Sequence, residues 1–134
     1  MVTYRDIRSQ LAPTFRFTDD EECSLRLMVK LPDGRQQGVG VLEVERKDGT
    51  KLLALNTPVA PLANMAPVSC LKWNVFSTVG ALAVTEIEGE PYVVLTDSIP
   101  YSLLDLDQLD GIVTVFAKVA DELEAKMTDG QDWY

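Results

Sequence analysis

The chain has 134 residues, about the length of one domain, and its 46% hydrophobic and 25% charged residues are typical of a globular protein. Twelve Lys and Arg stand against 21 Asp and Glu, and the net charge of −9 argues against nucleic acid or an anionic membrane as partner. The sequence has no histidine, which is the commonest general base and metal ligand. We expect a single domain over 1–128 and a flexible C-terminal tail over 129–134.

The first half of the chain predicts one short helix followed by three or four strands. Thr3 and Asp6 form a T-x-x-D capping box, and Pro13 stops the helix that begins there. Alternating apolar residues and the turns at Asp33-Gly34 and Asp48-Gly49 then predict strands. We expect these strands at 15–17, 23–31, 36–46 and 51–56, with an acidic loop over 19–22.

The second half of the chain predicts a proline-rich loop, a helix, two strands and a final helix. The prolines at 58, 61 and 67 break the periodicity and predict a loop of about ten residues. A short helix is expected at 65–76, strands at 80–87 and 91–99, and a long amphipathic helix that Asp105 and Gln108 cap. The fold class is therefore α+β, with an antiparallel sheet and the order α-β-β-β-(β)-α-β-β-α.

The two cysteines indicate no metal site. Cys23 and Cys70 lack the C-x-x-C spacing of metal ligands, and Cys23 lies on the apolar side of its predicted strand, where it would act as a small hydrophobe. No signal-peptide pattern opens the chain, and no stretch has the ~20 apolar residues of a membrane span. We therefore expect a cytoplasmic protein.

The sequence predicts no enzyme, no cofactor and no metal. Gly38-Val39-Gly40 lies within a strand, where glycines mark bulges or close packing more often than phosphate sites. Asp105, Asp107 and Asp110 are the best carboxylate candidates, but acids at a helix N-terminus are favoured by the helix dipole anyway. A metal-dependent hydrolase that uses these aspartates remains an alternative.

The middle helix favours binding over chemistry, because it is apolar around most of its circumference. Val68, Leu71 and Val75 form one stripe, other apolar residues project elsewhere, and Lys72 is its only charge. Such a helix is either buried within one subunit or packed between its own sheet and a second copy, as in a homodimer. The candidate partner or dimer contacts are Met65, Val68, Leu71, Trp73 and Phe76.

Several short segments resemble the YbjN-domain family. The run 33–39 resembles its R-x-Q-x-V signature, and 71–74 resembles its L-x-x-N motif on the middle helix. Further matching segments are 98–100, 106–110 and 120–124, so the resemblance covers about residues 23–125. The motif positions are Arg35, Gln37, Val39, Asn74, Asp121 and Glu124.

This resemblance implies a fold shared with the class I type III secretion chaperones, the CesT-like or Tir-chaperone group. It implies a non-enzymatic chaperone or adaptor that binds a protein partner through apolar helix and sheet surface. A regulatory module that binds a ligand or another regulator on the same fold is the alternative. Arg35 and Gln37 share one face of their strand, and they either hold the sheet together or contact a partner.

Overall fold

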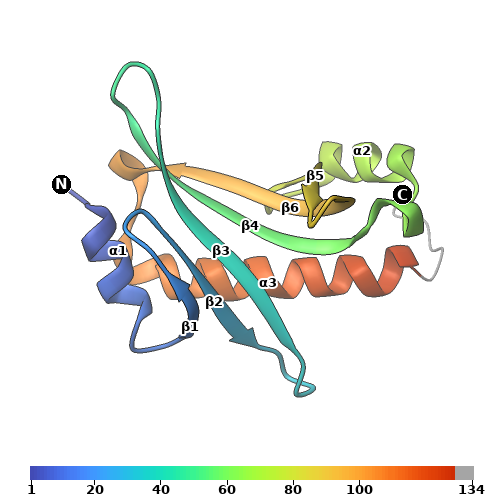
Figure 1. Cartoon of the computed structure of the whole chain (residues 1–134), viewed down its shortest axis with the longest axis horizontal. Coiled ribbons are helices and arrows are strands. Elements are labelled where there is room, and N and C mark those ends of the chain that lie inside the picture. The colour runs from blue at the N-terminus through green and yellow to red at the C-terminus, as the bar shows by residue number, and fades with distance from the viewer. Residues whose placement is uncertain (129–134) are drawn as a thin grey trace.

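The computed structural model describes residues 1–128 and shows one open, six-stranded antiparallel sheet with three α-helices (Figure 1). The strand order across the sheet is β1-β2-β3-β4-β6-β5. The helices are α1 (Tyr4–Leu11), α2 (Pro67–Phe76) and α3 (Leu106–Thr128), and the strands are β1 (Arg16–Asp20), β2 (Ser24–Lys30), β3 (Gln36–Glu45), β4 (Lys51–Pro61), β5 (Ala81–Ile87) and β6 (Glu90–Pro100). Two 3₁₀ turns, η1 (Leu62–Asn64) and η2 (Tyr101–Leu103), follow β4 and β6. The predicted fold class and element order are confirmed, and the expected tail at 129–134 lies outside the described residues.

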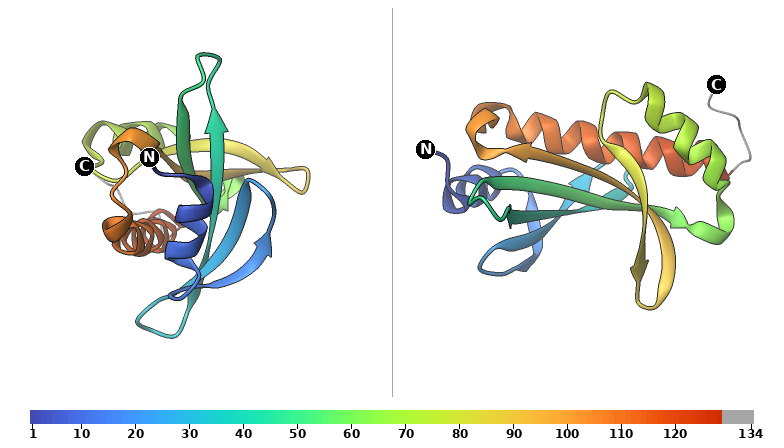
Figure 2. Two further views of the ribbon diagram at one scale, coloured as in Figure 1. Left: turned by 90° about the vertical axis from the view of Figure 1, so that its left-hand side faces the viewer. Right: turned by 90° about the horizontal axis from the view of Figure 1, so that it is seen from above.

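The core lies between the sheet and two of the helices. Helix α3 packs along β2, β3 and β4, and α1 packs against α3, whereas α2 stands apart beside β5 (Figure 2). Alternate side chains of the strands face α3, as the strict alternation in 23–31 predicts. The largest fully buried side chains include Ile7, Leu11, Leu27, Leu53, Leu55, Leu95, Leu109, Phe116 and Leu123.

The predicted N-terminal caps at Thr3, Asp6 and Asp105 are confirmed. The Thr3 side chain accepts a hydrogen bond from the Asp6 amide, and the Asp6 carboxylate accepts one from the Thr3 amide, which completes the capping box of α1. At the start of α3 the Asp105 carboxylate accepts from the Asp107 amide at 3.0 Å. These contacts satisfy backbone N–H groups that have no partner inside a helix.

The predicted loop at 58–67 is wrong over its first part, because β4 continues to Pro61 and pairs with β6. The β3–β4 pairing ends at Gly40 and Asn56, and the alternation of the ladder directs the backbone nitrogen of Pro58 toward β3. The missing N–H of Pro58 therefore removes no hydrogen bond between β4 and β6. A register shift between Pro58 and Ala60 then carries the strand into η1.

The predicted acidic loop at 19–22 is also partly wrong, since Asp19 and Asp20 belong to β1. The Arg8 guanidinium of α1 donates to both carboxylate oxygens of Asp20, at 3.0 and 3.1 Å from Nε. This bidentate hydrogen bonding by Arg8 holds the pKa of Asp20 below its usual range. Asp20 thus fastens the end of an edge strand to the first helix.

Candidate functional site

Helix α2 carries an exposed apolar stripe. Pro67 is the first residue of the helix. The structure describes every residue of α2, and among them Cys70 alone is buried. Val68, Leu71 and Val75 are 63%, 66% and 75% exposed, and we call them the α2 stripe. They lie three, four and seven positions apart and hence on one side of the helix. The alternative of a helix buried within one subunit is therefore wrong.

Of the five predicted contact residues, three are exposed and two are not. Val68 and Leu71 belong to the α2 stripe, and Phe76, next to Val75 in the chain, is 76% exposed. Met65 precedes α2 and is buried in the core, and Trp73 is half-buried against it. Met65 therefore offers no accessible surface, and Trp73 offers part of its ring.

Asn74 fastens α2 to the edge of the sheet. Its Oδ1 accepts a hydrogen bond from the Leu82 amide at 2.7 Å, and its Nδ2 donates to the Leu82 carbonyl at 3.1 Å. The carboxamide thus makes the pair of bonds that a neighbouring strand would make. In the register, Leu82 lies opposite Leu95 of β6. The N–H and C=O of Leu82 point away from β6, and Asn74 binds both of them.

Beyond Leu82 the edge of β5 is open. Backbone groups alternate in direction along an antiparallel ladder, so Val84 and Glu86 also direct their N–H and C=O away from β6. The Val84 side chain is 58% exposed and lies on the same side of the strand as Leu82. An apolar groove of about 220 Å³ runs between this strand and α2. Its walls are Leu62, Pro67, Cys70, Leu71, Leu82, Ala83, Val84 and Val93.

Arg35 and Asp121, two of the positions that resemble the YbjN motifs, meet in an ion pair. Arg35, the residue before β3, places its guanidinium 2.8 Å from Asp121 of α3 and also donates to Asp33 in the preceding turn. The side chain of Asp121 is 17% exposed, whereas that of Arg35 is 55% exposed. The contact joins the β2–β3 turn to the last helix, which is the structural one of the two roles expected for Arg35.

Gln37 and Thr57 bridge the gap that Pro58 leaves between β3 and β4. The fully buried Thr57 hydroxyl donates to the Gly38 carbonyl at 2.6 Å, in place of the N–H that proline lacks. Gln37 Nε2 donates to Thr57 Oγ1 at 2.6 Å and to the Pro58 carbonyl at 2.9 Å. These contacts of Gln37 are of the structural kind, between two strands of the sheet.

The remaining motif positions have different surroundings. Val39 is fully buried in the core beneath α3. Glu124 lines a surface hollow of about 390 Å³ together with Gln37, Pro58 and Tyr92. The motif residues are thus spread along the β3–α3 and α2–β5 contacts.

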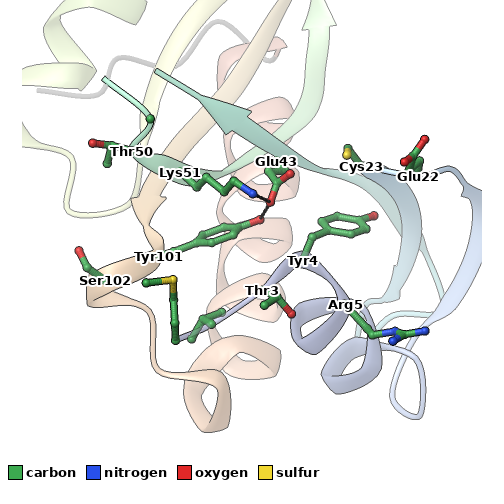
Figure 3. A pocket seen from close by; sticks show the side chains of 13 residues that line it. Thr3, Tyr4, Arg5, Glu22, Cys23, Glu43, Thr50, Lys51, Tyr101 and Ser102 are labelled. Carbon is green, nitrogen blue, oxygen red and sulfur yellow. Dashed lines mark hydrogen bonds and ion pairs between the residues drawn. The ribbon is translucent and has the colours of Figure 1, made fainter. Parts of the chain in front are cut away.

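A cavity of about 600 Å³ lies at the opposite end of the molecule from α2, near the N-terminus (Figures 1 and 3). It is bounded by the first turn of α1, the β1–β2 connection, the β3–β4 hairpin and η2. Cys23 lies in its wall and is exposed, so the expectation of a core cysteine is wrong for this residue, which precedes β2. Partial desolvation of the sulfur and the neighbouring Glu43 raise the pKa of the Cys23 thiol, which disfavours the reactive thiolate.

Two of the aspartates at the start of α3 are engaged in hydrogen bonds within the fold. Asp105 is used in capping, and Asp110 Oδ2 accepts from Thr14 at 2.6 Å, which ties α3 to the segment after α1. Among residues 1–128 no group of three or more acidic or cysteine side chains is placed to hold a metal ion. No helix in this described part combines the length and the apolarity that crossing a membrane requires.

No protein-family model matches this chain, and no curated protein is significantly similar to it.

Proposed function

We propose that this protein is a non-enzymatic cytoplasmic chaperone or adaptor, built on a scaffold like that of the YbjN proteins and type III secretion chaperones. The observation that supports it is the α2 stripe, which adjoins the open part of the β5 edge. A cluster of large apolar side chains at 63–76% exposure marks an interaction surface more often than a solvated one.

The surface combines two ways of binding a polypeptide. The backbone of Val84 and Glu86 can pair with an extended segment of the partner, while the apolar groove receives its side chains. Asn74 closes the edge at Leu82, so pairing is confined to the end of β5 near the β5–β6 turn. Glu86, Glu88 and Glu90 surround that turn and favour a partner segment with basic residues.

A second copy of the chain is the other expected partner. The α2 stripe is a single surface without acidic residues, and such a patch can pair with itself across a two-fold axis. Transferring one exposed leucine into an interface contributes about 1.5–3 kcal/mol. Leu71, at the centre of the stripe and in the groove wall, is the side chain whose loss should matter most.

The test is Leu71→Glu, with Leu103→Glu as the matched control. Leu103 is 76% exposed on η2 and lies outside α2 and its groove. Sedimentation velocity should show a dimer for the wild type and the control, and a monomer for Leu71→Glu. Affinity capture from the native host should recover a protein partner with the wild type and the control, and lose it with Leu71→Glu.

Two results would contradict the proposal. The first is capture of the same partner, at the same yield, by Leu71→Glu and the wild type. The second is a monomeric wild type that recovers no protein at all. The near-ultraviolet circular dichroism of each variant verifies that the fold is retained.

The alternative function is a regulatory module that binds a ligand. One observation favours it, namely the cavity near the N-terminus, which is as large as a small-molecule site.

A further inference from the structure

Apolar atoms make up most of the inner surface of the cavity near the N-terminus, and one partly buried carboxylate lies among them. Its volume of about 600 Å³ lies within the range of sites for small organic molecules. Met1, Val2 and the rings of Tyr4 and Tyr101 supply apolar surface, and Figure 3 shows the two rings. The polar lining residues are Thr3, Arg5, Glu22, Cys23, Glu43, Thr50, Lys51 and Ser102.

The Glu43 carboxylate has spare capacity to bind a cation. Its side chain is 15% exposed, and Oε1 accepts a hydrogen bond from the Tyr101 hydroxyl at 3.0 Å. Lys51 Nζ is 3.9 Å from the same oxygen, at the outer limit of an ion pair. A carboxylate offers about four acceptor positions, and Lys51, whose side chain is 48% exposed, can leave for solvent.

The two tyrosines complete a site for a positively charged group. In the view of Figure 3 the Glu43 carboxylate lies above and between the rings of Tyr4 and Tyr101. Aromatic faces attract organic cations, and tyrosine is among the better rings for this. Burial raises the pKa of both hydroxyls, so Tyr101 stays a hydrogen-bond donor to Glu43 at neutral pH. The buried Tyr4 hydroxyl has no hydrogen-bond partner within residues 1–128 and remains available to a polar group.

We propose that this cavity binds a small organic molecule with a primary ammonium group on an apolar or aromatic body. The ammonium would take the place that Lys51 now occupies beside Glu43, and the body would lie against Met1, Val2 and the tyrosine rings. An anionic ligand would face the partly buried Glu43 carboxylate, which is unfavourable in a site of low polarity. The net charge of −9 attracts cations toward the whole molecule.

The test uses phenethylamine as the probe, followed by amide shifts in ¹H–¹⁵N correlation spectra. We expect saturable shifts at Glu43, Lys51 and Tyr101, which line the cavity. Glu43→Gln keeps an acceptor for Tyr101 but removes the charge, and it should weaken binding at least about tenfold. Lys51→Met removes the competing ammonium and should tighten binding severalfold. Glu122→Gln, at an exposed position on α3 outside the cavity lining, is the matched control and should bind like the wild type.

Two further probes distinguish the charge and the source of the amine. The carboxylate 3-phenylpropionate, which has the same ring, should bind at least about tenfold more weakly. Nα-acetyl-lysine amide carries the ammonium of a protein side chain without the ring and should also bind more weakly. Equal or tighter binding of this lysine derivative would overturn the assignment in favour of a lysine of a protein partner.

The proposal is refuted if phenethylamine causes no amide shifts at concentrations up to about 10 mM, which is far above the Kd of a specific site. It is also refuted if Glu43→Gln binds as tightly as the wild type, or if Lys51→Met binds more weakly. The inference does not depend on protein binding by α2, and Leu71→Glu should bind phenethylamine unchanged.

Discussion

Replacing Asn74 by alanine tests whether one carboxamide really holds α2 on the sheet. The variant loses two hydrogen bonds, of 2.7 and 3.1 Å, between Asn74 and the backbone of Leu82. A net contribution of about 0.5–1.5 kcal/mol for each bond predicts a loss of about 1–3 kcal/mol in the free energy of unfolding. For a chain of this size that corresponds to a fall of roughly 4–10 °C in Tm.

Urea unfolding measures the loss, and Asn64→Ala is the matched control. Asn64 is exposed in η1, and its replacement should change the free energy of unfolding by less than about 0.5 kcal/mol. Amide hydrogen exchange supplies a local measurement, because the Leu82 amide points to the open edge and Asn74 is its acceptor. The exchange of this amide should accelerate in Asn74→Ala beyond what the global loss explains. If its protection and the stability match those of the control, the assignment of Asn74 as a substitute strand is wrong.

Two more predictions concern the β3–β4 gap and the tyrosines. Thr57→Val keeps the shape but removes the hydroxyl that donates to Gly38 and accepts from Gln37. It should lower the free energy of unfolding in urea by about 1–3 kcal/mol. Thr85→Val, at an exposed site on β5, is the control, and an equal effect of the two variants would contradict the role of the Thr57 hydroxyl between β3 and β4. Because burial raises the pKa of Tyr4 to about 12, the folded state keeps a proton that the unfolded chain loses near pH 10. The contribution of Tyr4 to the free energy of unfolding is complete below pH 10 and should decline between pH 10 and 12. The decline should be less steep in Tyr4→Phe. A free energy of unfolding of the wild type that stays constant to pH 12 would contradict this prediction.

Local patterns were enough to predict most of the fold. The capping box at Thr3 and Asp6, the alternation in β2 and the apolar arc of α3 each depend on neighbours a few residues apart. The continuation of β4 through Pro58 could not be predicted in this way. Whether a proline ends a strand depends on which neighbour its nitrogen faces, and that follows from the register with β3 and β6.

The candidate sites were less accessible to sequence reasoning. The helical wheel of 65–76 indicated two apolar sides, but only the position of α2 beside β5 shows that Cys70 faces inward and Leu71 outward. The cavity near the N-terminus combines residues from segments up to about a hundred positions apart, such as Tyr4 and Tyr101. One local signal was available, since Glu43 shares a strand face with the buried Val39 and Val41. A charged residue in such a row indicates a polar contact inside the fold.

The strand order gives the α2–β5 segment a particular independence. Because β6 lies between β4 and β5, the outermost strand is attached to the rest of the sheet through β6. Loss of α2, β5 and the turn between them would therefore leave the pairing of the first four strands with one another intact. Such an opening would free the backbone N–H and C=O groups of Tyr92, Val94 and Thr96, which β6 directs toward β5. The strand order that leaves a short edge of β5 open thus also covers a second edge, that of β6.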